Sequence, residues 1–307
     1  MSDYKYSIEA KNVNKNFYKN YKKVHALIDF DIAIEKGSIH GLLGPNGAGK
    51  STFINILGGL VKKNTGIVKI CGIDIDKDPK KSKFKIGIVP QELNIDPFFS
   101  PVELLELQAG LYGIPKKKRK TDEILDNLKL NDQRNAYART LSGGMRRRLL
   151  IAKALVHSPE MLILDEPTAG VDIDIRSSVW KYIKKINELG TTICLTTHYL
   201  EEAENLCDKI SIINFGKKIK EDYKKNLLNI ISDKSVTFML NKIYKIPPEL
   251  NEFNPILDNI RLTITYDKNK NNLKNIIDIL DKYNIDFNEI NTSESDLEDV
   301  FLKLIKG

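Results

Sequence analysis

The sequence has few of the features that mark secreted or membrane-spanning chains. Its apolar runs are short, such as residues 162–164 and 210–213, whereas a membrane-spanning helix needs about 18 or more consecutive apolar residues. The three cysteines, Cys71, Cys194 and Cys207, contain no Cys-x-x-Cys pair, which argues against a disulfide framework or a zinc site. The first residues hold no apolar stretch that resembles a signal peptide. We therefore expect a chain that spans no membrane and stays in the cytoplasm.

Charge and composition limit the possible partners. Hydrophobic residues make up 41% and charged residues 29% of the chain, a balance typical of folded globular proteins. The formal net charge is +7, but lysine and asparagine are spread along the sequence and form no sustained basic stripe. We therefore attribute the charge to overall composition and expect no nucleic-acid partner.

The first 222 residues alternate strand and helix patterns. Short apolar runs predict buried strands, and helical patterns lie between most of them. Such alternation is typical of a layered α/β fold with a largely parallel sheet. The predicted strands are residues 39–43, 85–89, 161–164, 192–195 and 209–213, and the first of them is followed by a predicted helix at 50–57.

A run of helices interrupts this alternation at residues 101–157. It opens on a capping box formed by Ser100 and Glu103, with Pro101 at the first helical position. We interpret residues 92–157 as a helical subdomain inserted into the α/β core.

The sequence changes character after residue 222, where asparagine and lysine dominate. The 307 residues suggest about two domains at roughly 150 residues each. We assign residues 1–222 to the first domain and 223–307 to a small α+β accessory domain. Its predicted elements are strands at 236–240 and 260–266, a helix at 273–283, and a terminal amphipathic helix that begins at a second capping box, 295–298.

A phosphate-binding loop is the strongest local motif. Residues 44–51 fit G-x-x-x-x-G-K-[ST] at every position, after a predicted strand and at the start of a predicted helix. Glycines let successive backbone N–H groups point at phosphate oxygens, Lys50 adds a charge for the β- and γ-phosphates, and Ser51 offers a hydroxyl to Mg²⁺. The predicted nucleotide-binding residues here are Gly44, Pro45, Asn46, Gly47, Ala48, Gly49, Lys50, Ser51 and Thr52.

Two acids end the predicted strand at 161–164. An apolar run of this kind is buried on both faces, so Asp165 and Glu166 lie at the carboxyl edge of the sheet, where ligands bind in open α/β folds. Asp165 is placed to hold a metal, and Glu166 to polarise an attacking water as general base.

The stretch Leu141-Ser142-Gly143-Gly144-Met145 resembles the LSGGQ signature of the ATP-binding cassette ATPases. This family has its signature between the phosphate loop and the acidic strand, as here. The resemblance implies a P-loop NTPase core with a mixed or parallel sheet, and it covers about residues 1–222.

The resemblance also implies roles for residues outside these motifs. Gln91 matches the glutamine that leads into the helical subdomain, where it helps hold Mg²⁺, and His198 matches the switch histidine that contacts the γ-phosphate. Asp172 matches the acid in the loop after the acidic strand. Phe17 matches the aromatic that stacks on adenine, with Tyr18 or Tyr21 as alternatives.

One position of the signature departs from the family. Met145 replaces the usual glutamine, whereas Ser142, Gly143 and Gly144 retain the groups that contact the γ-phosphate. Three arginines, residues 146–148, follow on the same predicted helix. We interpret them as a solvated face, and the alternative is that one of them pairs with an acid across the helical subdomain.

The resemblance implies a mechanism and its partners. One phosphate loop and one signature cannot close an ATP site alone, so a second copy or a paralogous ATPase is expected, with two ATP between the subunits. Glu166, His198 and Gln91 are the implied catalytic residues, and Ser51, Gln91 and Asp165 the implied Mg²⁺ ligands.

The implied function is ATP hydrolysis that drives a separate membrane permease. Residues 197–204 and the C-terminal sequence SDLEDVFLKLIKG resemble the ABC-2 type exporters. The chain would then be peripheral on the cytoplasmic face, bound to a permease with about six spans. An importer ATPase and a soluble cassette protein that acts on ribosomes or DNA are the alternatives.

Overall fold

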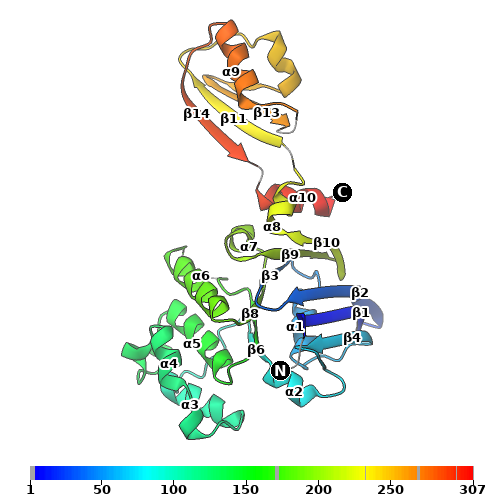
Figure 1. The fold of residues 1–307 in the computed structure, drawn as a ribbon, viewed down its shortest axis with the longest axis vertical. Coiled ribbons are helices and arrows are strands. Elements are labelled where there is room, and N and C mark those ends of the chain that lie inside the picture. The colour runs from blue at the N-terminus through cyan, green and yellow to red at the C-terminus, as the bar shows by residue number, and fades with distance from the viewer. Residues whose placement is uncertain (1–3, 170–172, 232, 268–269, 295, 307) are drawn as a thin grey trace. The chain divides into compact units, whose positions relative to one another are not determined.

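The computed structural model describes residues 4–169, 173–231, 233–267, 270–294 and 296–306. The chain divides into two compact units, Met1–Lys224 and Lys225–Gly307 (Figure 1). The sequence analysis places this division after residue 222. Each unit is described separately below.

The first unit is built on a six-stranded sheet in the order β10-β9-β3-β8-β7-β6. Strands β6 to β9 and β3 run parallel, and β10 pairs antiparallel at one edge. The apolar runs form these strands because both faces of the sheet are covered; Ile39–Leu43, for example, is buried throughout. The bounds are β3 Ile39–Leu43, β6 Ile86–Val89, β7 Met161–Asp165, β8 Thr192–Thr197, β9 Lys209–Asn214 and β10 Lys217–Tyr223.

A second, antiparallel sheet comes from the first part of the chain, in the order β2-β1-β4-β5. Its two long strands pair from Tyr6 with Glu35 to Lys19 with Lys22, with register shifts on both sides of Val13. This sheet is absent from the elements predicted from the sequence. The bounds are β1 Tyr6–Lys19, β2 Lys22–Glu35, β4 Thr65–Ile70 and β5 Ile73–Asp74.

Helix α1, Lys50–Leu57, packs between the two sheets (Figure 1). Its Phe53 meets Phe30 of β2 with ring centroids 5.0 Å apart. One apolar cluster joins this helix to strands of both sheets, so the phosphate loop that precedes α1 has a rigid base. The other core helices are α2 Pro79–Phe84, α6 Ile173–Glu188 and α7 Leu200–Leu206.

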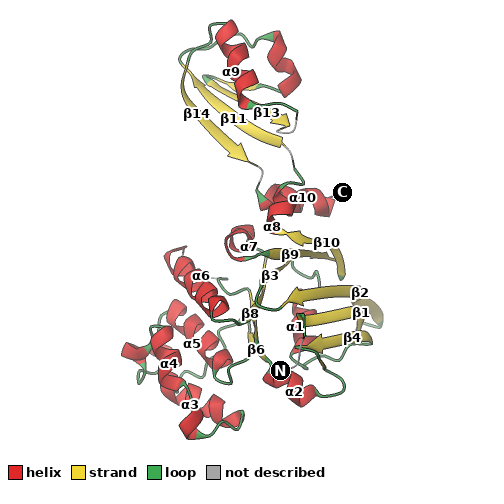
Figure 2. Cartoon of the chain, in the orientation of Figure 1, coloured by secondary structure: helices red, strands yellow, loops and turns green. Residues whose placement is uncertain are grey.

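A helical segment lies on the other side of the six-stranded sheet (Figure 2). Its helices are α3 Pro101–Leu111, α4 Thr121–Asn127 and α5 Gly143–Leu155, with short 3-10 turns between them. Helix α3 begins as expected, because Ser100 and Glu103 exchange side-chain and backbone hydrogen bonds. The segment has its own apolar cluster, which includes Leu105, Leu125 and Leu149.

The second unit is a four-stranded antiparallel sheet in the order β12-β13-β11-β14, with helices. Phe238 and Ile264 from the sheet and Ile276 from α9 share one apolar cluster. The α+β class predicted for this region is therefore what the structure has. Ser295, the predicted cap of the last helix, lies outside the described residues. The bounds are α8 Lys224–Leu228, β11 Asp233–Leu240, β12 Ile256–Asp258, β13 Arg261–Asp267, α9 Leu273–Lys282, β14 Phe287–Glu294 and α10 Leu297–Lys306.

Candidate nucleotide site

The predicted phosphate loop connects β3 to α1 at the carboxyl edge of the parallel strands. Gly47 and Gly49 have φ values of 80° and 112°, in the left-handed region that favours glycine. A Cβ on Gly44 would lie 2.3 Å from the carbonyl oxygen of Ile213, so the loop passes directly against β9. Pro45, Asn46 and Ala48 complete the loop, and Lys50, Ser51 and Thr52 form the first turn of α1.

Lys50 folds back over the loop that precedes it. Its Nζ donates hydrogen bonds to the carbonyl oxygens of Gly44 and Pro45, at 2.6 and 3.1 Å. Burial lowers the pKa of the ammonium, and the nearby carboxylates of Glu166 and Asp165 oppose this shift. The cation therefore lies between the loop and the two acids.

Asp165 and Glu166 end β7 next to this loop. Thr196 at the end of β8 donates its hydroxyl to Asp165 Oδ1 at 2.5 Å, and the N–H of Glu166 donates to the Thr196 carbonyl at 3.0 Å. Burial raises the pKa of the Asp165 carboxyl. Glu166 has a φ of 47°, an uncommon value for a non-glycine residue. The acids are thus held in place by the neighbouring parallel strand.

The Glu166 carboxylate lies between two other predicted residues. Gln91, just after β6, donates from Nε2 to Glu166 Oε2 at 2.9 Å. His198, just after β8, has its Nδ1 3.1 Å from Glu166 Oε1. Glu166 is 5% exposed, whereas the His198 side chain that contacts it is 40% exposed. Three residues from three strand ends therefore meet at one carboxylate.

The signature residues lie at the start of α5. Ser142 is the N-cap of this helix, and its Oγ accepts a hydrogen bond from the N–H of Met145 at 3.3 Å. Ser142 and Gly143 are exposed, whereas Gly144 is buried. Met145 packs against the apolar cluster of the helical segment. The exposed turn therefore presents its hydroxyl and backbone to solvent.

The remaining predicted residues are less constrained. Phe17 lies on β1, half-exposed, with the Lys15 ammonium 4.7 Å from its ring centroid. Tyr18 and Tyr21 are more exposed than Phe17. These contacts do not select one of the three aromatic residues for adenine. Asp172 lies outside the described residues.

The interpretation of the three signature-helix arginines as a solvated face is wrong for Arg147. This side chain is 1% exposed, and its guanidinium donates to the carbonyl oxygens of Pro90 and Glu166, at 2.8 and 2.7 Å. The helical period gives the missed signal, because Gly144, Arg147, Ile151 and Ala154 recur at spacings of three and four and are all buried.

Glu202 on α7 is a second buried, hydrogen-bonded charged residue that was not predicted from the sequence. Its buried Oε1 accepts hydrogen bonds from Thr168 Oγ1 at 2.9 Å and from Trp180 Nε1 at 3.3 Å. Burial raises the pKa of this carboxyl. Glu202 thus joins the turn after Glu166 to α6 and to the helix that follows His198.

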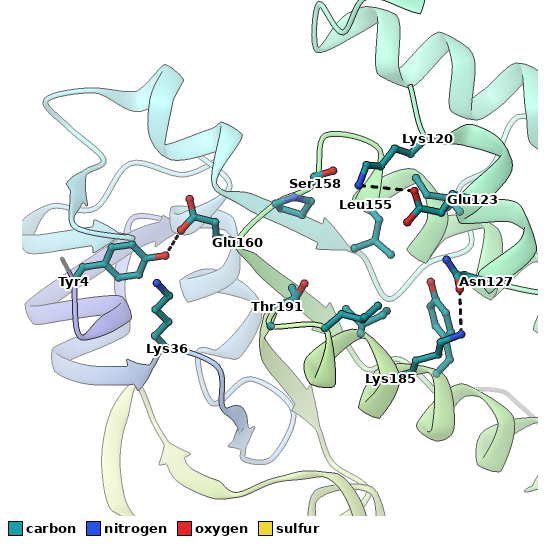
Figure 3. A pocket seen from close by; sticks show the side chains of 16 residues that line it. Tyr4, Lys36, Lys120, Glu123, Asn127, Leu155, Ser158, Glu160, Lys185 and Thr191 are labelled. Carbon is teal, nitrogen blue, oxygen red and sulfur yellow. Dashed lines mark hydrogen bonds and ion pairs between the residues drawn. The ribbon is translucent and has the colours of Figure 1, made fainter. Parts of the chain in front are cut away.

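A separate cavity lies near the amino ends of β7 and β8 (Figure 3). Its charged side chains are engaged with neighbours: Tyr4 donates to Glu160, Lys120 lies 3.8 Å from Glu123, and Lys185 donates to Asn127 at 3.1 Å. The described residues that line it include none of the predicted nucleotide-binding residues. This cavity is therefore distinct from the candidate site.

Known proteins match both the sequence and the fold. The profile of the ABC transporter family matches residues 27–169. The linearmycin resistance ATP-binding protein LnrL of Bacillus subtilis is 41% identical to this chain over 215 residues, which is 69% of each chain. The Nod factor export ATP-binding protein I of Cupriavidus pinatubonensis is 39% identical over 213 residues, 69% of this chain and 66% of that protein.

Solved structures agree with this assignment. An ATP-binding cassette dimer in a post-hydrolysis state, bound to ADP and Pi, aligns with a TM-score of 0.63 and 28% identity, over 70% of this chain and 98% of that one. CbiO1 from Clostridium perfringens, part of an ABC transporter complex, gives 0.65 and 28%, over 74% and 92%. In the part of the chain that the structure describes, no helix is long and apolar enough to cross a membrane. The predicted family and fold are confirmed: the chain belongs to the ABC transporter family, as one of its ATP-binding ATPase subunits.

Proposed function

We propose that two copies of this subunit, or one copy and a paralogue, close around two ATP molecules and drive export through a separate membrane permease. The observation that carries the proposal is the Glu166 carboxylate, which Gln91 and His198 contact from two sides beside the phosphate loop. A buried carboxylate in this setting suits the activation of water rather than a purely structural role.

The nucleotide is held by the phosphate loop and the first turn of α1. The loop from Gly44 to Gly49 and the helix N-terminus supply N–H donors, and the Lys50 ammonium neutralises the phosphates. Ser51 and Thr52 contribute hydroxyl groups. Phe17 is the proposed adenine contact, because it matches the family's aromatic position, and Tyr18 or Tyr21 is the alternative.

The residues present fit a Mg²⁺ ion. Asp165, Ser51 and the amide oxygen of Gln91 are all oxygen donors, which a hard divalent cation prefers. Because Gln91 directs Nε2 to Glu166, its Oε1 is the atom suited to the metal. When bound, Mg²⁺ would offset the negative charge that develops on the transferred phosphoryl group.

Glu166 is the proposed general base, and His198 positions it. The carboxylate accepts the proton of the attacking water, while Gln91 and His198 fix its two oxygens. His198 also contacts the γ-phosphate in this proposal. Ser142, Gly143 and Gly144 of one subunit complete the site of the other, and Asp172 is proposed as a further nucleotide-binding residue.

Export is supported by the relatives, which are named for Nod factor export and for linearmycin and daunorubicin resistance. We propose a permease with about six spans and a position for this subunit on the cytoplasmic face of the membrane. The helical segment offers the docking surface, since Phe98, Leu107 and Leu111 are more than half exposed there. The relatives' names favour an exporter over an importer.

The proposal is tested with Glu166→Gln. Loss of the general base should lower the rate of ATP hydrolysis by about 10²–10⁴, and the variant should accumulate as a dimer in MgATP, measured by light scattering after size exclusion. Glu201→Gln is the control, because Glu201 is an exposed carboxylate on α7 and should retain the wild-type rate. A strictly monomeric Glu166→Gln protein at saturating ATP would count against the proposal.

A further inference from the structure

Arg147 is a buried cation that holds three segments of the first unit together. It lies on α5, the helix that begins at Ser142. Its Nη1 donates to the Pro90 carbonyl at 2.8 Å and its Nη2 to the Glu166 carbonyl at 2.7 Å. A guanidinium suits this task because it is planar and directs several N–H groups in fixed directions, which an ammonium does not.

Both carbonyls belong to segments that carry the proposed chemistry. Pro90 immediately precedes Gln91, and the Glu166 carbonyl also accepts the N–H of Ala169 at 3.1 Å, closing the turn after β7. A shift of Arg147 would therefore move the Gln91 backbone and the Glu166 turn together. The donor side chains of Gln91 and His198 meet at the same Glu166 carboxylate.

Burying the Arg147 guanidinium has a desolvation cost, so a specific interaction must compensate for it. Burial lowers the pKa of the Arg147 guanidinium, and the carboxylates of Glu202, Asp165 and Glu166 oppose that shift. An uncharged residue of similar volume would fill the space without the desolvation cost. Such a residue could not make the two hydrogen bonds to the Pro90 and Glu166 carbonyls.

Another polar contact between this part of the chain and the sheet lies at the opposite end of α5, far from the site. His157, just after α5, has its Nε2 3.0 Å from the carbonyl of Ile86, at the amino end of β6. Arg147 makes its contacts beyond the carboxyl ends of β6 and β7. It is therefore the contact that fixes the signature end of α5 against the catalytic turn.

We propose that Arg147 is a positioning residue that couples the two ATP sites of the dimer. Through its side-chain hydrogen bonds, Arg147 holds the segments that carry Gln91 and Glu166, which act on the ATP of their own subunit. Through its place on α5, Arg147 also sets the position of Ser142 to Gly144, which contact the ATP of the partner subunit. The inference rests on the proposed dimer.

The test compares Arg147→Lys and Arg147→Met with wild type. Three quantities are measured: binding of a fluorescent ATP analogue to the monomer, the kcat and Hill coefficient of hydrolysis, and MgATP-dependent dimerisation with Glu166→Gln added. Binding to the monomer should be unchanged, because the Arg147 guanidinium donates to Pro90 and Glu166, which lie outside the phosphate loop. In Arg147→Met, kcat should fall by about 10²-fold through misplacement of the catalytic turn, and the Hill coefficient should fall to one. Arg147→Lys should be intermediate.

Arg148→Met is the matched control. Arg148 also donates to two carbonyl oxygens, those of Leu128 and Lys129, but both lie within the helical segment. This variant should keep the wild-type Hill coefficient, whatever its melting temperature. An equal loss of cooperativity in Arg148→Met, or an unchanged kcat and Hill coefficient in Arg147→Lys, would overturn the inference.

The design separates this inference from the proposed function. If wild type hydrolyses ATP without forming a dimer, the proposed dimer fails and the coupling with it. If wild type dimerises and is cooperative but Arg147→Lys behaves identically, the coupling alone fails. Should Arg147→Met not fold, Arg147→Lys decides the matter, because it keeps the buried charge and gives up the forked pair of bonds.

Discussion

Buried charged residues around Glu166 are where the sequence is hardest to interpret. The phosphate loop, Asp165 and Glu166 are predicted from short contiguous motifs. They lie together at one sheet edge, as expected. Arg147 does not follow, because charge alone favours a solvated position. Only the helical period, weighed against the charge, would have placed it on the buried face.

Glu202 yields a pH-dependent prediction. Burial raises the pKa of its carboxyl in the folded chain, against the attraction of Arg176. The carboxyl therefore contributes stability that is full below the unfolded pKa and is lost as the pH rises through the folded pKa. Glu202→Gln keeps an oxygen for Thr168 and Trp180 and removes the charge. The melting temperature of this variant minus that of wild type should become more positive as the pH rises above 4.5, the ordinary pKa of a glutamate carboxyl.

The measurement is a thermal melt of both proteins at several pH values in one ionic strength. Glu201→Gln, the neighbouring exposed carboxylate, should give a difference from wild type that stays flat over the same range. Parallel curves for Glu202→Gln and wild type would show that Glu202 does not titrate differently in the folded and unfolded chain.

At the scale of elements, the predictions succeed where a segment's pattern is local. Strand β3 and helix α1 have the predicted bounds, since an apolar run and a glycine loop agree there. The antiparallel sheet was missed because the lysines and asparagines of β1 obscure its apolar pattern. In β2 the spacing of Phe30, Ile32 and Ile34 is the strand signal that was overlooked. The stability of the two strands comes from pairing with each other and with β4, which is non-local information.

The close packing of the phosphate loop against β9 gives a prediction for Gly44. A methyl group there would meet the Ile213 carbonyl at 2.3 Å, so the loop or the strand must shift. We expect Gly44→Ala to lower the free energy of unfolding by about 1–3 kcal/mol, as overpacking does, and to weaken nucleotide binding. Urea denaturation and binding of a fluorescent ATP analogue measure the two effects.

Gly143→Ala is the stability control for that variant. Its added Cβ meets no atom within 4 Å, at the first position of α5. The free energy of unfolding should stay within about 0.5 kcal/mol of wild type, as for most surface changes. Equal destabilisation by both substitutions would mean that the contact with Ile213 is not the cause.

At the scale of the whole molecule, the sequence and the structure agree on a cassette with a small second unit. The first unit holds every predicted site residue that the structure describes. The second has its own apolar cluster of strands and α9, so it is a body with its own core rather than a tail. None of the proposed nucleotide-site residues that the structure describes lies in this second unit.

The last prediction concerns that partner. A tagged copy purified from detergent-solubilised native membranes should bring down, in stoichiometric amount, a protein with about six membrane spans. Phe98→Asp and Leu111→Asp place a charge on exposed apolar side chains of the helical segment, 67% and 76% exposed, and should reduce this co-purification while leaving ATP hydrolysis unchanged. Leu60→Asp, at an 81% exposed position after α1, is the matched control and should keep the partner. Recovery of ribosomes or nucleic acid instead would leave the ATPase in place and refute the assignment to export.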